Sequence, residues 1–127
     1  MSAAILLRRL SCSSLGLVAV TMLGACGTSP DDRPQTFEFI ALEVLTPACG
    51  TVACHSSSTH AKGFAFDTLD DARAALRSLV TPGNPEASRI YDVISGSRNP
   101  QMPPDAPMAT QDIDLVRAWI SAGAPGL

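Results

Sequence analysis

The sequence predicts an all-α domain built from about four short helices and long connecting loops. In these stretches apolar residues recur every three or four positions, which is the spacing of a helix that buries one face. Segments rich in proline and glycine separate the stretches. No stretch alternates between apolar and polar residues for long enough to predict a strand. The length of 127 residues fits one small domain.

The first two predicted helices lie on either side of a polar loop. The first runs from Phe37 to Leu45 and is expected to end at Pro47, because proline cannot donate the hydrogen bond of an interior turn. The second runs from Asp70 to Leu79, and acidic residues at its start favour a helix N-terminus. Their apolar faces consist of Phe37, Ile40, Ala41 and Val44 in the first helix and Leu69, Ala72, Leu76, Leu79 and Val80 in the second.

Proline and glycine also delimit the last two helices. Pro85 is well placed in the first turn of the third helix, which follows a break at 81–85. A Pro-rich loop, 95–109, leads to the fourth helix, for which Thr110 is the expected cap and Gly123 the stop. The residues expected to face the core are Ile90, Val93 and Ile94 in the third helix and Ile113, Val116, Trp119 and Ile120 in the fourth.

The N-terminal residues have the features of an export signal. Arg8 and Arg9 precede an apolar run, 15–25, that is too short to span a bilayer. The run ends in Leu-Gly-Ala followed by Cys26, which resembles the bacterial lipobox, where the cysteine is lipidated and becomes the first mature residue. An ordinary secretory signal with an incidental Cys26 is the alternative. The lipobox interpretation divides the chain into a signal peptide (1–25), a lipidated cysteine with a flexible tether (26–36) and a folded domain (37–127).

This organisation predicts a lipid-anchored protein of the cell envelope that faces the periplasm. Gly27 takes the place of the aspartate that marks inner-membrane retention in some bacteria, which slightly favours the outer membrane. The net charge of −3 and the scattered Lys and Arg residues argue against nucleic acid as a partner. The sequence also predicts no enzyme, because it holds only 2 histidines and neither a Ser/His/Asp set nor a phosphate-binding glycine loop.

Candidate chemistry is concentrated between Cys49 and His55. The thiols of Cys49 and Cys54 are followed at once by an imidazole, and covalent haem attachment uses these residue types, with thioethers from the thiols and iron ligation by the histidine. Four residues separate the cysteines where two are usual, and Gly50 is expected to ease the wider loop through its conformational freedom. A Cys49–Cys54 disulfide and a zinc site completed by His60 are the alternatives.

A second iron ligand is expected from the Pro-rich loop. Met102 precedes two prolines that stiffen the backbone, so its thioether is favoured over that of Met108. Packing of Met102 on the core without a ligand role is the alternative. Phe64, Phe66 and Trp119 are expected to line an apolar pocket around the porphyrin, whose burial would supply apolar area that a thin core lacks. We therefore expect the haem-free form to be poorly ordered.

Five segments of the chain carry a resemblance to a known family. They are Pro47-Ala48-Cys49 through Cys54-His55, Lys62-Gly63-Phe64-Ala65-Phe66-Asp67, Pro82-Gly83-Asn84-Pro85 with Ser88 and Ile90, Met102-Pro103-Pro104, and Ile113 through Ala124. In this order they resemble the small class I c-type cytochrome domains of planctomycete and myxobacterial exported proteins. The resemblance implies a class I cytochrome c-like fold around one covalent haem c. It assigns Cys49 and Cys54 to the thioethers, His55 to the proximal iron position and Met102 to the distal one.

These observations together predict a membrane-anchored mono-haem c-type cytochrome. The protein would fill both axial positions of the iron, which leaves no open position for a substrate and favours electron transfer. The expected partners are redox proteins, and the membrane is reached through the lipid anchor. The alternative is a haem-free exported lipoprotein that serves as an interaction module, with Cys49 and Cys54 joined as a disulfide.

Overall fold

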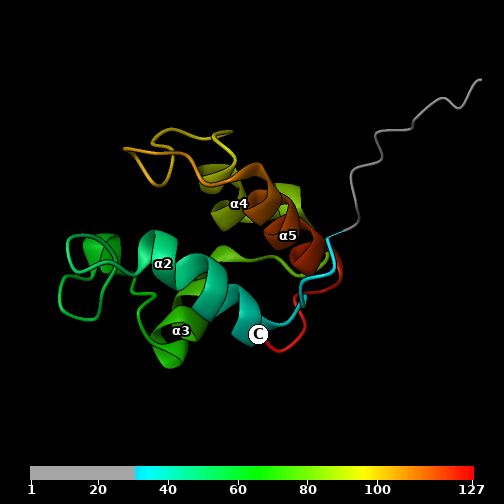
Figure 1. Cartoon of the computed structure of the whole chain (residues 1–127), viewed down its shortest axis with the longest axis horizontal. Coiled ribbons are helices and arrows are strands. Elements are labelled where there is room, and N and C mark those ends of the chain that lie inside the picture. The colour runs from blue at the N-terminus through cyan, green and yellow to red at the C-terminus, as the bar shows by residue number, and fades with distance from the viewer. Residues whose placement is uncertain (1–30) are drawn as a thin grey trace, which may run out of the picture.

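The computed structural model describes residues 31–127, so the expected signal peptide, 1–25, and the expected lipidation site, Cys26, lie outside the described residues. The described part is helical and contains no strand, which confirms the all-α prediction (Figure 1). Within it, no helix is both long and apolar enough to cross a membrane. The elements are α1 (Phe37–Phe39), η1 (Ile40–Leu45), α2 (Thr46–Cys49), η2 (Ala61–Gly63), α3 (Leu69–Leu79), η3 (Pro85–Ala87), α4 (Arg89–Ile94) and α5 (Thr110–Ser121).

The first three elements form one continuous helical stretch from Phe37 to Cys49. The predicted end at Pro47 is wrong, because the helix widens into the π-helix η1 just before the proline. At this point the Thr46 N–H bonds to Ala41 O, five residues back, and the Thr46 hydroxyl donates to the same oxygen at 2.9 Å. Pro47 then occupies the first turn of α2, where a missing N–H is tolerated. The helix therefore ends at Cys49.

α3 confirms the second predicted helix, with its start one residue earlier, at Leu69. Thr68 caps the helix, because its hydroxyl accepts a hydrogen bond from Asp71 N at 3.2 Å. The buried face of α3 consists of Ala72, Ala75, Leu76 and Leu79.

The third predicted helix is divided in two. Pro85 begins the 3-10 turn η3, which the Asn84 side chain caps. α4 starts only at Arg89, because Ser88 is extended and fully buried. The Ser88 hydroxyl accepts a hydrogen bond from Thr81 N at 2.9 Å and donates one to Asn84 O at 2.8 Å. These local bonds compete with a continuous helix and interrupt it.

α5 differs from its prediction only at its start. Ala109, not Thr110, is the residue before the helix, and no side chain caps it; Thr110 is already helical. Asp112 in the first turn accepts a hydrogen bond from the Arg33 guanidinium at 2.6 Å, which attaches the segment before α1 to this helix end. Gly123 follows the helix with φ of 94° and ends it as predicted, since this left-handed conformation suits glycine.

The core lies between the stretch 37–49, α3, α4 and α5. In Figure 1, α4 and α5 lie together on one side of the domain, with α2 and α3 on the other. The Pro125 carbonyl joins the two ends of the fold, since it accepts hydrogen bonds from Phe37 N at 3.2 Å and from Trp119 Nε1 at 3.1 Å. The largest fully buried side chains are Trp119, Phe37, Ile40, Leu45, Leu76, Ile94, Leu115, Ile120 and Val116.

Candidate functional site

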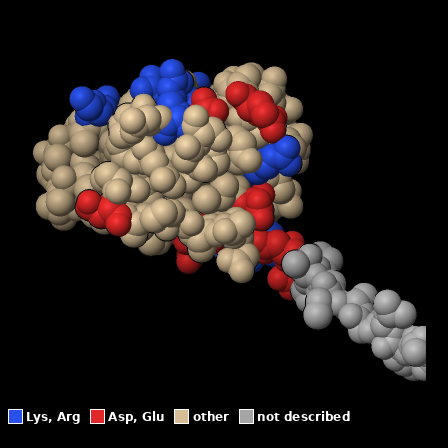
Figure 2. Space-filling model, turned by 90° about the horizontal axis from the view of Figure 1, so that it is seen from above, with Lys and Arg blue, Asp and Glu red and all other residues tan. Residues whose placement is uncertain are grey.

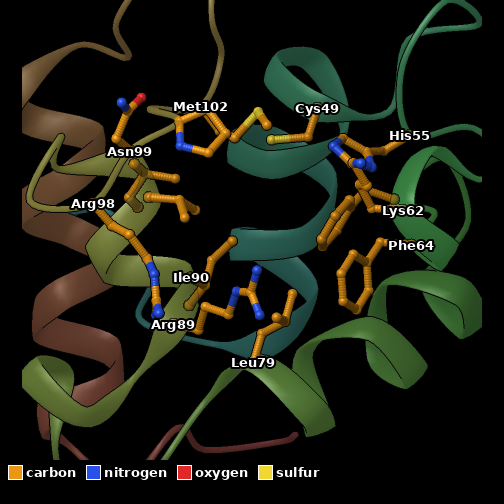
Figure 3. A pocket seen from close by; sticks show the side chains of 14 residues that line it. Cys49, His55, Lys62, Phe64, Leu79, Arg89, Ile90, Arg98, Asn99 and Met102 are labelled. Carbon is orange, nitrogen blue, oxygen red and sulfur yellow. The ribbon is translucent and has the colours of Figure 1, made fainter.

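A cavity of about 480 Å³ opens between the end of α2, the segment after η2, α3, α4 and the Pro-rich loop (Figure 3). Ligand pockets in proteins typically measure roughly 300–1,000 Å³. Its lining residues are Cys49, His55, Lys62, Phe64, Phe66, Leu79, Arg89, Ile90, Val93, Ile94, Arg98, Asn99, Pro100 and Met102. Most of these side chains are apolar, so the cavity suits a largely apolar ligand.

His55 presents an imidazole whose Nδ1 is buried and has no hydrogen-bond partner. It is the one buried side-chain nitrogen or oxygen atom without a partner in residues 31–127. The main chain holds the residue firmly, because His55 N donates to Cys49 O at 3.1 Å and His55 O accepts from Phe66 N at 2.8 Å. A buried polar atom without a partner costs about 1–3 kcal/mol. Imidazole is also the commonest metal ligand in proteins, so this residue fits an axial iron position.

The two cysteines differ in their surroundings. Cys49 is buried and lines the cavity, whereas Cys54 is half-buried and is not among the lining residues. Both thiols are free in the structure. The pKa of the Cys49 thiol is raised to about 11, mainly because the thiol is buried and to a smaller extent because Cys54 is nearby. At neutral pH the free Cys49 side chain is therefore a neutral thiol.

Met102 lies in the same cavity as His55. Its backbone N–H donates to Val93 O at 2.9 Å, which attaches the Pro-rich loop to α4. Figure 3 shows Met102 and His55 on opposite sides of Cys49 in that view. Met108, the other methionine of the loop, does not line the cavity and packs against the core instead. The structure thus brings the favoured candidate into the site and leaves the other outside it.

Two of the three aromatic residues predicted for the pocket lie on its wall. Phe64 and Phe66 line the cavity, and the Phe66 ring meets the His55 ring edge-on with centroids 5.8 Å apart. Trp119 does not line the cavity. It is fully buried in the core, where its indole N–H bonds to Pro125 O. The prediction for Trp119 is corrected accordingly: this face of α5 packs inward, away from the cavity.

The side chains of the zinc alternative are not brought together. His60 lines a second, smaller cavity of about 210 Å³, beside Asp71 and Ser78, and not the cavity that holds His55 and Cys49. In the part of the chain that the structure describes, no three His, Cys, Asp or Glu side chains are grouped as a metal site would require.

Gly50 is needed for a different reason from the one expected. Its φ of −76° is open to any residue, so conformational freedom is not what the position uses. A Cβ atom placed on Gly50 would lie 2.9 Å from Thr46 O, 3.0 Å from Phe66 O and 3.1 Å from Asp67 N. The end of α2 therefore packs directly on the backbone of the segment that carries Phe66.

Asp67 holds the loop that follows His55. Its carboxylate accepts hydrogen bonds from Ser57 N at 2.7 Å and from the Ser57 hydroxyl at 2.8 Å. These bonds lower the pKa of Asp67 below its usual value. The Thr46 hydroxyl shares its one proton between Ala41 O, at 2.9 Å, and Phe66 O, at 2.6 Å, and so ties the same segment to the first helix. His55 and Phe66 are thus fixed relative to each other by contacts on either side.

Three cationic residues on the cavity wall were not predicted. Lys62, Arg89 and Arg98 are exposed and line the cavity. They lie far apart in the sequence, and no local pattern separates them from solvated charges elsewhere. The apolar residues of α4 did carry a signal, because Ile90, Val93 and Ile94 had been expected to face inward and all three line the cavity.

A comparison with known protein families indicates which kind of domain this is. The family model described as Planctomycete cytochrome C matches residues 52–106, a range that includes Cys54, His55, Phe64, Phe66 and Met102. This match supports a cytochrome c domain of the planctomycete type, in agreement with the resemblance noted from the sequence. No curated protein and no solved structure matches the chain.

Proposed function

We propose that this protein is a membrane-anchored mono-haem c-type cytochrome that carries single electrons between redox proteins of the cell envelope. One observation carries the proposal: a single cavity unites the buried Cys49 thiol, the His55 imidazole, whose Nδ1 is buried without a hydrogen-bond partner, and the Met102 thioether. These groups come from the end of α2, the loop after it and the Pro-rich loop. They would supply one of the two thioethers and both iron ligands of a c-type haem, and Cys54, next to His55 in the chain, would supply the second thioether.

The residues of the site would hold the haem in two ways. Cys49 and Cys54 would attach it through thioethers, while His55 and Met102 would supply nitrogen and sulfur to the iron. Ligation by the Met102 thioether together with His55 would favour the reduced iron and raise the reduction potential. When bound, haem c supplies an iron that alternates between the ferric and ferrous states by one electron.

The walls of the cavity keep water away from this site. Phe64, Phe66 and Ile90 are apolar, and Phe66 and Ile90 are themselves buried. With His55 and Met102 on the two axial positions, no position would remain for a substrate. We therefore propose that the protein is an electron carrier and not an enzyme. It would accept one electron from one redox protein and donate it to another.

The spectrum of the protein tests the haem. The full chain is exported in a host that performs cytochrome c maturation, and its pyridine haemochrome is recorded after acid–acetone extraction. A c-type absorption band that survives extraction is expected, whereas Cys49→Ala or Cys54→Ala should weaken attachment. A colourless protein, from a host shown to mature a control with the same cysteine spacing, would refute the proposal and favour the haem-free module with a Cys49–Cys54 disulfide.

The axial ligand has a matched control in the same loop. Met102→Ala is expected to abolish the absorption of ferric iron that depends on a thioether ligand and to lower the reduction potential. Met108→Ala should change neither, because Met108 lies outside the cavity. Equal spectra for both variants and the unchanged protein would refute axial ligation by Met102.

The membrane anchor is proposed from the sequence around Cys26. Cys26→Ala is expected to abolish incorporation of labelled fatty acid and to release the protein from the membrane fraction. Cys12→Ala is the matched control, since Cys12 belongs to the expected signal peptide and should be removed with it. Fatty acid on the Cys26→Ala variant would refute lipidation at this residue. Separation of the two membranes would then test the outer membrane against the inner.

A further inference from the structure

Three of the seven Lys and Arg residues in the described part of the chain line the cavity. The chain has 12 acidic and 9 basic residues, yet Lys62, Arg89 and Arg98 all line this one cavity. No Asp or Glu is among its lining residues. The other titratable groups there are the Cys49 thiol and the His55 imidazole. Figure 2 shows Lys and Arg side chains gathered at the top of its view of the protein surface, with Asp and Glu side chains beside them.

These cations are weakly paired within the protein. Arg98 meets Asp92 at 3.7 Å, a long distance for an ion pair, and no ion pair joins Lys62 or Arg89 to any residue of the described part. By contrast, Arg117 bonds to Glu86 at 2.9 Å, outside the cavity. Charges that surround an apolar cavity and have no close partner are suited to an anionic ligand that binds there.

We propose that Lys62, Arg89 and Arg98 bind the two propionate carboxylates of the haem. The proposal rests on the proposed haem function of this cavity. An arginine guanidinium matches a carboxylate with two parallel N–H donors, and a lysine ammonium adds a third charge. The Asn99 amide, which also lines the cavity, is a neutral donor for the same group.

The distribution of polarity explains how the three residues would orient the ring. Leu79, Ile90 and Ile94 form a buried apolar floor, where a carboxylate would lose its hydration without gaining a partner. The cations are exposed and therefore lie where the cavity meets solvent. The macrocycle enters with its apolar edge inward and its carboxylates toward these cations. Each exposed pair contributes little by itself, so the three together fix the orientation.

The pH dependence of the reduction potential tests this assignment in the haem-loaded protein. Loss of nearby positive charge makes a carboxylate easier to protonate. We expect the triple variant Lys62→Gln, Arg89→Gln, Arg98→Gln to shift the pH-dependent step of the midpoint potential upward by about 1 pH unit. Single variants should give smaller shifts. Arg77→Gln, on α3 and exposed but outside the cavity, is the control and should leave the profile unchanged.

Each outcome of this experiment separates the two proposals. A coloured triple variant with an unchanged pH profile overturns the propionate assignment and leaves the proposed function intact. The same unchanged profile, together with slower electron exchange with an acidic redox protein, would assign the cations to partner docking instead. A colourless unaltered protein, seen first by its pyridine haemochrome, overturns the proposed function and this assignment with it.

Discussion

Substitution of Gly50 by alanine tests whether the end of α2 must pack directly on the segment that carries Phe66. The added methyl group would meet three backbone atoms, Thr46 O, Phe66 O and Asp67 N, at 2.9–3.1 Å. Backbone atoms cannot turn away as the end of a flexible side chain can. The end of α2 and the segment 66–67 must therefore move apart. Cys49 lies at the end of α2 and Phe66 lies in the segment 66–67, so both residues would shift.

The expected loss of stability follows from two opposing effects. With φ at −76°, alanine fits the backbone and would by itself stabilise the fold by about 0.4–1 kcal/mol through the unfolded chain. Overpacking costs about 1–3 kcal/mol, and the upper part of that range applies because all three contacts are to main chain. The net destabilisation is about 1–2.5 kcal/mol. For a domain of this size, the melting temperature falls by roughly 4–20 °C.

Thermal unfolding of the haem-loaded protein, followed by circular dichroism, measures this loss. The absorption spectrum is recorded on the same samples, because movement of Cys49 and Phe66 should also disturb the haem. Gly63→Ala is the control: its φ of 83° strains alanine, but nothing lies within 4 Å of the added carbon. The control should lose stability and keep its spectrum. A Gly50→Ala protein that melts at or above the temperature of the unaltered protein would refute the packing argument.

Three further predictions concern the core, the loop after His55 and the cofactor. Trp119→Phe should lower the free energy of unfolding by about 1–3 kcal/mol, because the Pro125 carbonyl loses the indole N–H that donates to it. The haem spectrum should stay unchanged, since Trp119 does not line the cavity. An altered spectrum would show that Trp119 contacts the haem. The pKa of the Asp67 carboxyl is lower in the folded protein than its ordinary value of 3.8. The hydrogen bonds from Ser57 to this carboxylate therefore stabilise the loop fully above pH 3.8, and this stabilisation is lost as the pH falls through the pKa of the folded protein. The protection of Ser57 N against hydrogen exchange, relative to the intrinsic rate at each pH, should therefore fall in acid. Asp67→Asn should lack this acid-dependent step, and an identical step in the variant would assign it to another group. The haem-free protein should lose its near-ultraviolet circular dichroism, because the apolar walls of the cavity would be left in contact with water instead of the porphyrin. Equal melting temperatures with and without haem would contradict this prediction.

The parts of the site that lie close together in the sequence were the parts that could be predicted from it. Cys49, Cys54 and His55 form one short segment, and the stiff Met102-Pro103-Pro104 segment identified the second candidate ligand. Helical periodicity likewise predicted α3 and α5, because their apolar faces repeat at the spacing of a helix.

The errors arose where a tertiary contact outweighed a local rule. The helix passes Pro47 because a π-turn precedes it, and the Thr46 hydroxyl supports that turn from the side. Ser88 interrupts the third helix because its buried hydroxyl bonds to Thr81 and Asn84. Periodicity assigned Trp119 to an apolar face correctly, but it does not reveal whether that face meets other helices or a ligand.

The cationic mouth of the cavity shows why a site of this kind escapes sequence analysis. Lys62 lies in η2, Arg89 begins α4 and Arg98 lies beyond its end, so it is the fold and not the local sequence that places all three on one cavity. The Met102 N–H bond to Val93 O attaches that loop, and the same bond brings the Met102 thioether to the cavity. A substitution that weakens this attachment should therefore disturb both Met102, the proposed iron ligand, and the Arg98 side of the mouth. The two cannot be treated as independent features of the site.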